Sequence, residues 1–232
     1  MATTHEPKIE IGRQECFNWL GYSTFDPPFH TPGLGLFFKG LNIAVSPANA
    51  ISNQGNSFTW ELWFYLFNPS VDQYIVCTME DLAPSLFSKR LCLSVASSAY
   101  VLEINYNAPG SSAAATTKNI GSAVGGWNFF ILKIYDDVAN PGKHVVNATV
   151  VKSDGTNATI QEDNQGPYQN SATYMTVFGG LLSYNGGVIE GSKYFTGGLH
   201  YLRVTHQRVY DYELYVAYYK GRETYKIYDL FL

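Results

Sequence analysis

The chain is poor in charged residues and has no long apolar run. Only 15% of its 232 residues are charged, well below the usual ~25%. The net charge is −4, and the lysines and arginines are scattered along the sequence, so nothing forms the basic stripe that nucleic acid or an anionic membrane requires. No apolar stretch approaches the ~18 residues of a membrane span. The sequence therefore predicts neither nucleic-acid binding nor membrane insertion.

Cysteines are also few. Cys16, Cys77 and Cys92 cannot all pair with one another within the chain. No CxxC motif or Cys/His cluster has the spacing of a zinc site. We therefore expect free, buried thiols.

The start of the chain, MATTHEPKIEIG, lacks the basic and apolar regions of a secretion signal. This predicts an intracellular protein, or an extracellular one if Met1 is not the natural start. Two sequons, at Asn147 and Asn157, would become possible glycosylation sites only in that second case.

Aromatic residues and period-2 alternation are abundant. Aromatics make up 16% of the chain, with 18 Tyr and 14 Phe, and about ten short alternating stretches are separated by Gly, Asn and Pro. This pattern predicts an all-β, two-sheet antiparallel sandwich with one short C-terminal helix over 213–221, which Gly221 would cap. Asp154-Gly155 predicts a tight hairpin turn. The expected strands are 35–45, 58–67, 73–79, 90–96, 99–106, 127–135, 143–152, 156–161, 173–180 and 195–206.

Three segments fall outside this strand pattern. Residues 108–126 are rich in small side chains and predict a long mobile loop, and GGVIEGSK at 186–193 predicts a glycine-rich turn. We divide the chain into an N-terminal aromatic and proline-rich extension (1–32), one domain (33–221) and an apolar C-terminal tail (222–232).

The stretch FTWELWFYLF at 58–67 is too apolar for a strand that exposes one face to solvent. If Phe58, Trp60, Leu62, Phe64 and Leu66 enter a core, then Thr59, Glu61, Trp63, Tyr65 and Phe67 form the other face. Such a face either binds a ligand or is covered by a terminal segment. The two ends of the chain are themselves apolar and aromatic, so they are candidates for that cover.

Six stretches follow one another along the chain in an order typical of one family. They are GLFFKGLNIAV, FTWELWFYLF, YIVC, GWNFFILKIYDD, KHVVNATVVKSDG and FTGGLHYLRVTHQRVYDYELYVAYY. Together they resemble the laminin-G-like, concanavalin-A-like lectin and glucanase jelly-roll family over residues 33–221. The resemblance implies two antiparallel sheets of six or seven strands packed face to face, one of them curved. It also implies that the tryptophan at position 63 is one that the family keeps both in members that bind a ligand and in members that do not.

The sequence departs from the catalytic and calcium-binding members of that family. Similar closing strands carry an acidic residue where this chain has His200, and the alternating acidic pattern of the glucanases is absent. Glycoside cleavage needs two carboxylates about 5 to 9.5 Å apart, a separation that residues i and i+2 of a strand provide. The one acidic pair with this spacing is Asp211 and Glu213. It lies at the start of the expected helix, where carboxylates interact favourably with the helix dipole. The adjacent pairs Glu80-Asp81, Asp136-Asp137 and Glu162-Asp163 suit turns. We therefore expect no enzyme.

We likewise expect no cofactor. The alternative is calcium, for which Asp136, Asp137 and Asn140 form the densest oxygen cluster in the sequence. A solvated hairpin turn explains the same three residues.

Two functions remain. The first is a non-catalytic assembly module that docks on protein neighbours in a larger complex through a sheet face and its aromatic ends. The alternative is a lectin-like carbohydrate-binding module. The predicted contact residues for either are Trp63, Tyr65, Phe67, Trp19, Tyr225, Tyr228 and Phe231.

Overall fold

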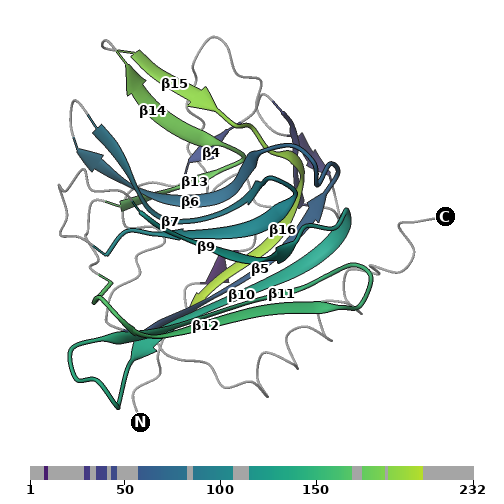
Figure 1. Cartoon of the computed structure of the whole chain (residues 1–232). Helices are drawn as coiled ribbons and strands as arrows, with labels where there is room; N and C mark the ends of the chain where they lie inside the picture. Colours follow the sequence, from purple (N-terminus) through teal and green to yellow (C-terminus); the bar gives the residue numbers. More distant parts are fainter. Residues whose placement is uncertain are drawn as a thin grey trace.

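A computed structural model shows two antiparallel β-sheets packed face to face (Figure 1). The structure describes residues 8–9, 29–31, 35–40, 43–45, 57–82, 86–106, 115–168, 174–185 and 188–205. Every regular element in these ranges is a strand, which confirms the predicted all-β sandwich. The helix predicted over 213–221 lies outside them. Within the same ranges, no helix is long and apolar enough to cross a membrane.

The larger sheet has eight strands in the order β12-β11-β10-β5-β16-β3-β2, with β1 paired to β16. Two of its short strands come from the predicted N-terminal extension, so part of that segment belongs to the sandwich. The strands are β1 (Lys8–Ile9), β2 (Phe29–Thr31), β3 (Gly35–Lys39), β5 (Phe58–Leu66), β10 (Gly126–Asp136), β11 (His144–Val151), β12 (Asn157–Gln165) and β16 (Thr196–Thr205).

The smaller sheet has six strands in the order β4-β13-β6-β7-β8-β9, and a separate hairpin pairs β14 with β15. Figure 1 shows the six-stranded sheet curved, with its concave face turned toward this hairpin. The strands are β4 (Ala44–Val45), β6 (Gln73–Leu82), β7 (Leu86–Ala96), β8 (Ala99–Ile104), β9 (Thr116–Ser122), β13 (Tyr174–Phe178), β14 (Leu181–Asn185) and β15 (Val188–Ser192).

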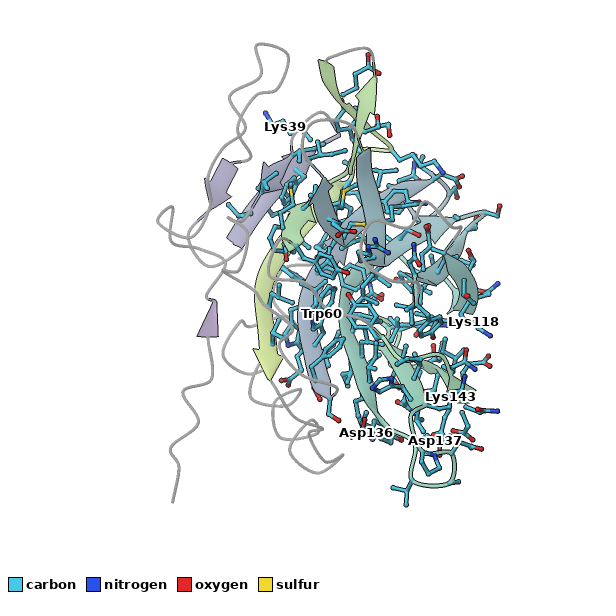
Figure 2. All side chains as sticks on the ribbon, turned by 90° about the vertical axis from the view of Figure 1, so that its left-hand side faces the viewer. Lys39, Trp60, Lys118, Asp136, Asp137 and Lys143 are labelled. Atoms are coloured by element: carbon cyan, nitrogen blue, oxygen red, sulfur yellow. A yellow bond between two sulfur atoms is a disulfide. The ribbon has the colours of Figure 1, made fainter. Side chains whose placement is uncertain are left out.

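The main hydrophobic core fills the space between the two sheets. Alternate residues of facing strands supply it, with Trp60, Phe64 and Phe130 among its fully buried side chains. Figure 2 shows Trp60 inside the sandwich and Asp136 and Asp137 at one end of it. Burial of this apolar surface is the main stabilising contribution to the fold.

Two predictions about connecting segments and one about a strand were wrong. The segment 108–126 contains β9, so its described part is a sheet edge rather than a loop. The glycine-rich turn at 186–193 contains β15, and the strand over 35–45 is split into β3 and β4. Gly40 follows β3 with φ of +83°, a backbone conformation that glycine adopts without steric cost.

The β11–β12 hairpin is confirmed, but its turn differs from the prediction. Gly155 has a positive φ of 83°, whereas Asp154 does not have a positive φ. Two backbone bonds close the turn: Gly155 N–H donates to Lys152 O, and Lys152 N–H donates to Thr156 O. This is a three-residue loop with glycine in the left-handed position rather than a two-residue turn.

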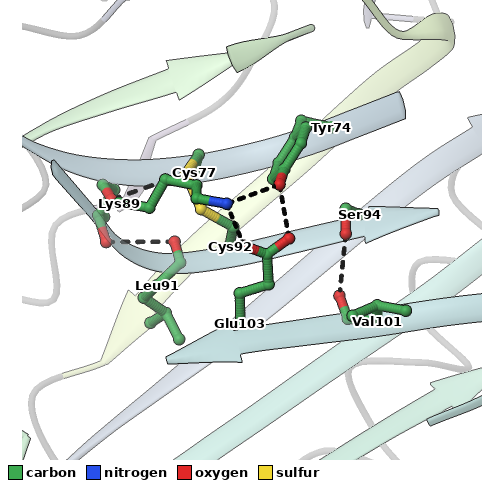
Figure 3. Close-up of a disulfide and its surroundings, with 9 residues drawn as sticks. Tyr74, Cys77, Lys89, Leu91, Cys92, Ser94, Val101 and Glu103 are labelled. Carbon is green, nitrogen blue, oxygen red and sulfur yellow. Dashed lines mark hydrogen bonds and ion pairs between the residues drawn. A yellow bond between two sulfur atoms is a disulfide. The ribbon is translucent and has the colours of Figure 1, made fainter. Parts of the chain in front are cut away.

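Cys77 and Cys92 are joined by a disulfide between β6 and β7 (Figure 3). The two residues face each other in register. The prediction of free thiols was therefore wrong for this pair, while Cys16 lies outside the described residues. A bulge between Thr78 and Met79 shifts the pairing of β6 and β7 by one residue, and this shift places the two cysteines opposite one another.

Candidate functional site

Strand β5 is buried on both faces. Phe58, Trp60, Leu62, Phe64 and Leu66 enter the core between the sheets, as predicted. On the opposite face, which we call the outer face, Thr59, Glu61 and Trp63 are also buried. Trp63 is 3% exposed and packs its ring 4.8 Å from that of Phe129. The ends of the chain expected to cover this face lie largely outside the described residues, so their role stays a prediction.

Four residues of the outer face form one row across neighbouring strands. Phe37 of β3 pairs with Gly198 of β16, Gly198 pairs with Tyr65 of β5, and Tyr65 pairs with Trp127 of β10. Directly paired residues on one face are close enough for their side chains to touch. The row therefore gathers three aromatic rings around a residue that has no side chain.

Phe67 completes this group, which we call the Phe67 cluster: Phe37, Tyr65, Phe67 and Trp127. The Phe67 ring centroid lies 5.8 Å from that of Phe37 and 4.8 Å from that of Tyr65. Tyr65 in turn lies 5.5 Å from Trp127. Adjacent rings are inclined by 63°, 66° and 79°, in the edge-to-face arrangement that aromatic pairs favour. Phe67 nevertheless remains 53% exposed.

The turn that carries Phe67 is held by a buried glutamine. The Gln73 amide nitrogen donates to Asn68 O at 2.6 Å and to Val71 O at 3.2 Å. Its amide oxygen accepts from Thr196 N–H at 3.0 Å, and Phe67 N–H donates to Thr196 O at 3.3 Å. These bonds tie the turn to β16, so the backbone that carries the exposed ring is held in place.

The sequence predicted half of this cluster. Tyr65 and Phe67 were predicted contact residues, and their alternation with the core residues of β5 is a local signal. Phe37 and Trp127 were missed because only the register of β3, β16, β5 and β10 brings them to the same row. Val71, which is 48% exposed on the Phe67 turn, was missed as well.

A polar group on the concave face of the six-stranded sheet was also missed. Figure 3 shows Tyr74, Lys89 and Glu103 together beside the disulfide. The Tyr74 hydroxyl donates to Glu103 at 2.6 Å, and the Lys89 ammonium donates to Glu103 at 2.6 Å and to Tyr74 at 3.0 Å. Three different strands supply these residues, so no motif in the sequence could reveal them.

The charges in this polar group stabilise one another. Burial, followed by the neighbouring Glu103 carboxylate, raises the pKa of Tyr74, which therefore stays a neutral phenol. Burial alone would lower the pKa of Lys89, but its bonds to Glu103 and Tyr74 outweigh this effect and raise it. The group is thus a hydrogen-bonded ion pair with a neutral phenol between its members, and every member has partners within the group.

The three candidate calcium ligands lie in the hairpin between β10 and β11. One Asp137 oxygen accepts from the N–H groups of Ala139 and Asn140, at 2.9 and 3.2 Å. The other accepts from the Asn140 side-chain amide at 2.8 Å and from Asn164 N–H at 2.9 Å. The Asp136 carboxylate lies 3.4 Å from Nε2 of the buried His144, and its side chain is 67% exposed. The Asp137 carboxylate therefore closes the turn, and among the described residues no three His, Cys, Asp or Glu side chains converge as metal ligands.

Acid should weaken this hairpin. The side-chain bond from Asn140 is the largest of the effects that lower the pKa of Asp137 below its ordinary value of 3.8. A lowered folded-state pKa means that the stabilisation is present above about pH 4 and is lost as the pH falls through the folded-state value. We expect Asp137→Asn to lower the melting temperature at pH 7 more than at pH 3. Asp163→Asn is the control, because this exposed carboxylate accepts one exposed side-chain bond, from Gln161. An equal loss at both pH values in Asp137→Asn would contradict the role of the charge.

The acidic pairs assigned to turns lie partly in strands. Glu80 and Asp81 belong to β6, and Glu162 and Asp163 belong to β12, so the turn prediction was wrong for both pairs. Glu80 is buried in an ion pair with Arg90. Asp211 and Glu213 lie outside the described residues, as do the predicted contact residues Trp19, Tyr225, Tyr228 and Phe231.

No protein-family model matches the chain, and no curated protein matches it. Solved structures do match, at low sequence identity. The binding domain of botulinum neurotoxin DC in complex with sialylT has a TM-score of 0.50 and 9% identity, covering 77% of this chain and 39% of that one. The LG1–3 region of the laminin alpha2 chain has a TM-score of 0.51 and 15% identity, covering 76% of this chain and 32% of that one.

An endo-β-1,4-glucuronan lyase from the fungus Trichoderma reesei has a TM-score of 0.47 and 14% identity, covering 78% of this chain and 77% of that one. The chain thus spans less than half of the toxin and laminin chains. At these identities the likeness establishes the fold, which is a concanavalin-A-like, laminin-G-like β-sandwich.

Proposed function

We propose that this chain is a non-catalytic binding module that docks on a protein neighbour in a larger complex. Its contact surface is the Phe67 cluster with Val71, and its aromatic terminal segments extend the contact. One observation carries the proposal: Phe67 is a half-exposed aromatic ring on a turn that part-buried hydrogen bonds of Gln73 hold in place. Among the described residues, the exposed large apolar side chains are Phe67, Val71 and Val138, and the first two share that turn.

The shape of the cluster favours a protein over a sugar. A pyranose stacks on an open, flat aromatic floor, whereas the planes of Phe37 and Tyr65 are inclined by 63° and 66° to that of Phe67. The exposed ring therefore projects from its turn and packs edge-to-face against two half-buried rings. Such a side chain fits a pocket on a partner, and rigid aromatic residues contribute much of the binding energy of protein interfaces.

Glycan binding remains the second candidate. The sandwich fold is shared with a toxin binding domain whose solved structure is in complex with sialylT, and the exposed face of Phe67 could stack on a single sugar ring. Under this alternative the same residue carries the binding, so the nature of the ligand separates the two functions.

Replacing Phe67 by alanine is expected to weaken partner binding by about 2 kcal/mol or more, which is roughly 30-fold in Kd. The ring is already half exposed, so the variant should keep its fold. The measurement is calorimetric titration of the purified full chain against its partner, which is first identified by site-specific crosslinking from the Phe67 turn.

Val138→Ala is the matched control, because Val138 is 96% exposed on a turn that does not carry the cluster. We expect it to bind like the unchanged chain. Equal affinity of the Phe67→Ala variant would contradict the proposal. Retention of the unchanged chain on a glycan array, lost on Phe67→Ala, would establish the sugar-binding alternative instead.

A further inference from the structure

Both glycosylation sequons lie on one face of the β11–β12 hairpin. Asn147-Ala-Thr149 is in β11 and Asn157-Ala-Thr159 is in β12. The alternate residues Ala148 and Ala158 pack toward the core, so the asparagines and threonines point to the outer face. The two threonines are paired in register, and their hydroxyl oxygens are 2.9 Å apart.

The two asparagines differ in their surroundings. Asn157 is the first residue of β12, directly after the turn, and its side chain is exposed. Asn147 is half-buried, and its amide nitrogen donates to Gln161 at 3.3 Å. Its neighbour in register on β10 is the buried Lys133. Asn157 is therefore the more open of the two positions for a bulky substituent.

A second, independent observation concerns the cellular compartment. Cys77 and Cys92 form a disulfide in the interior of the protein. Disulfides form and persist in oxidising environments such as the lumen of the secretory pathway, and they are rare in the cytosol. Asparagine-linked glycosylation is a modification of secreted proteins, so the disulfide and the exposed sequon point to the same compartment.

We propose that this chain matures in an oxidising secretory compartment and carries an oligosaccharide on Asn157, with Asn147 unmodified. The donor is a lipid-pyrophosphate-linked oligosaccharide. The Asn157 amide nitrogen forms a bond to the anomeric carbon of the first sugar and loses a proton to a base. The bond between that carbon and the pyrophosphate oxygen breaks, and the lipid pyrophosphate leaves with the electron pair.

The position of this glycan is compatible with the fold. Strand β12 is the edge of the eight-stranded sheet, and a glycan on a sheet edge hinders pairing with another chain. The sheet order β12-β11-β10-β5 places Asn157 three strands from β5, about 14 Å away at the usual strand spacing. This proposal does not depend on the proposed docking function.

The test is peptide mapping of the full-length protein from its natural source. Glycan-removing amidase in heavy-oxygen water converts a glycosylated asparagine into labelled aspartate. We expect the label at position 157 and none at 147, together with a Cys77–Cys92 disulfide-linked peptide that resists alkylation before reduction. An unlabelled position 157, a label at 147, or alkylation of both cysteines in the denatured, unreduced protein would overturn the proposal.

Variants of the full chain, expressed in eukaryotic cells behind a cleavable secretion signal, separate the sequon from the fold. Thr159→Ser keeps the sequon, and we expect the glycan to remain. Thr159→Val keeps the β-branched shape but removes the hydroxyl, and we expect the amidase-sensitive mass shift to disappear. Asn147→Gln should leave that shift unchanged. A shift that survives Thr159→Val, or is lost in Asn147→Gln, would contradict the assignment to Asn157.

Discussion

Replacing Glu80 by leucine is expected to lower the free energy of unfolding by about 3–5 kcal/mol. The Arg90 side chain has no exposure and that of Glu80 has 3%, so Arg90 would be left as a buried charge without its carboxylate. The Arg90 Nε and a terminal guanidinium nitrogen both donate to the same Glu80 oxygen. The Tyr174 ring, 5.8 Å from the Arg90 guanidinium carbon, cannot replace a carboxylate. Urea denaturation measures the loss.

The double variant Glu80→Leu/Arg90→Met separates the cost of removing the carboxylate from a buried arginine from the value of the pair. A buried ion pair can be replaced by apolar side chains at little cost, so we expect most of the stability to return. Glu162→Gln is the control. Glu162 forms an ion pair with Lys118 in which the Lys118 side chain is 26% exposed and that of Glu162 is 37% exposed. Such a pair should contribute at most about 1 kcal/mol to the free energy of unfolding. A double variant as unstable as Glu80→Leu would contradict this explanation.

Replacing Gly197 by alanine is expected to cost about 3 kcal/mol or more, because the strand has no room for a side chain there. An added Cβ would overlap the Tyr65 carbonyl oxygen and the Phe195 ring, and neither can move without disturbing the pairing of β5 and β16 or the core. Thermal denaturation measures the loss. Because Tyr65 belongs to the Phe67 cluster, partner binding should weaken as well.

Alanine substitutions at two other glycines, Gly125 and Gly198, serve as comparisons for Gly197→Ala. A Cβ on Gly125 would lie 3.4 Å from its nearest neighbour, which is ordinary van der Waals contact, and one on Gly198 would lie 3.2 Å from the Phe37 ring. We therefore expect stability losses in the order Gly197, Gly198, Gly125. A Gly197→Ala variant as stable as Gly125→Ala would show that the two strands are farther apart than described.

Local alternation predicted which side chains of β5 enter the core, because the period of a strand is a local property. The Phe67 cluster needed more than alternation. Pairing between β16 and β5 shifts by one residue between Leu199 and Tyr201, and this irregularity sets Gly198 opposite Tyr65. The sequence of one strand does not determine its register with a strand that is distant in the chain. Phe37 and Trp127 could therefore not be assigned to the cluster from the sequence.

The disulfide was missed for the same reason. From the tip of the hairpin, where Leu82 pairs with Leu86, regular pairing would set Cys77 opposite Leu91, and the bulge instead sets it opposite Cys92. Arg90 is the extra residue of that bulge, and its side chain is buried on Glu80. The buried ion pair and the disulfide thus both depend on the bulge between Thr78 and Met79. The sequences of β6 and β7 do not predict this bulge. Strand β9 was missed because TTKNIGS has Ile120 as its one buried residue, which leaves no alternation to detect.

The central claim is that Phe67 contacts a protein partner directly. A photo-crosslinking amino acid placed at position 67 of the full chain, and at position 138 as the control, tests it in the natural source. The account predicts one discrete protein adduct from position 67 and none from position 138, with the adduct lost on competition by the unchanged chain but not by the Phe67→Ala chain. Adducts that are the same from both positions, or a position 67 that crosslinks only to sugar, would contradict it.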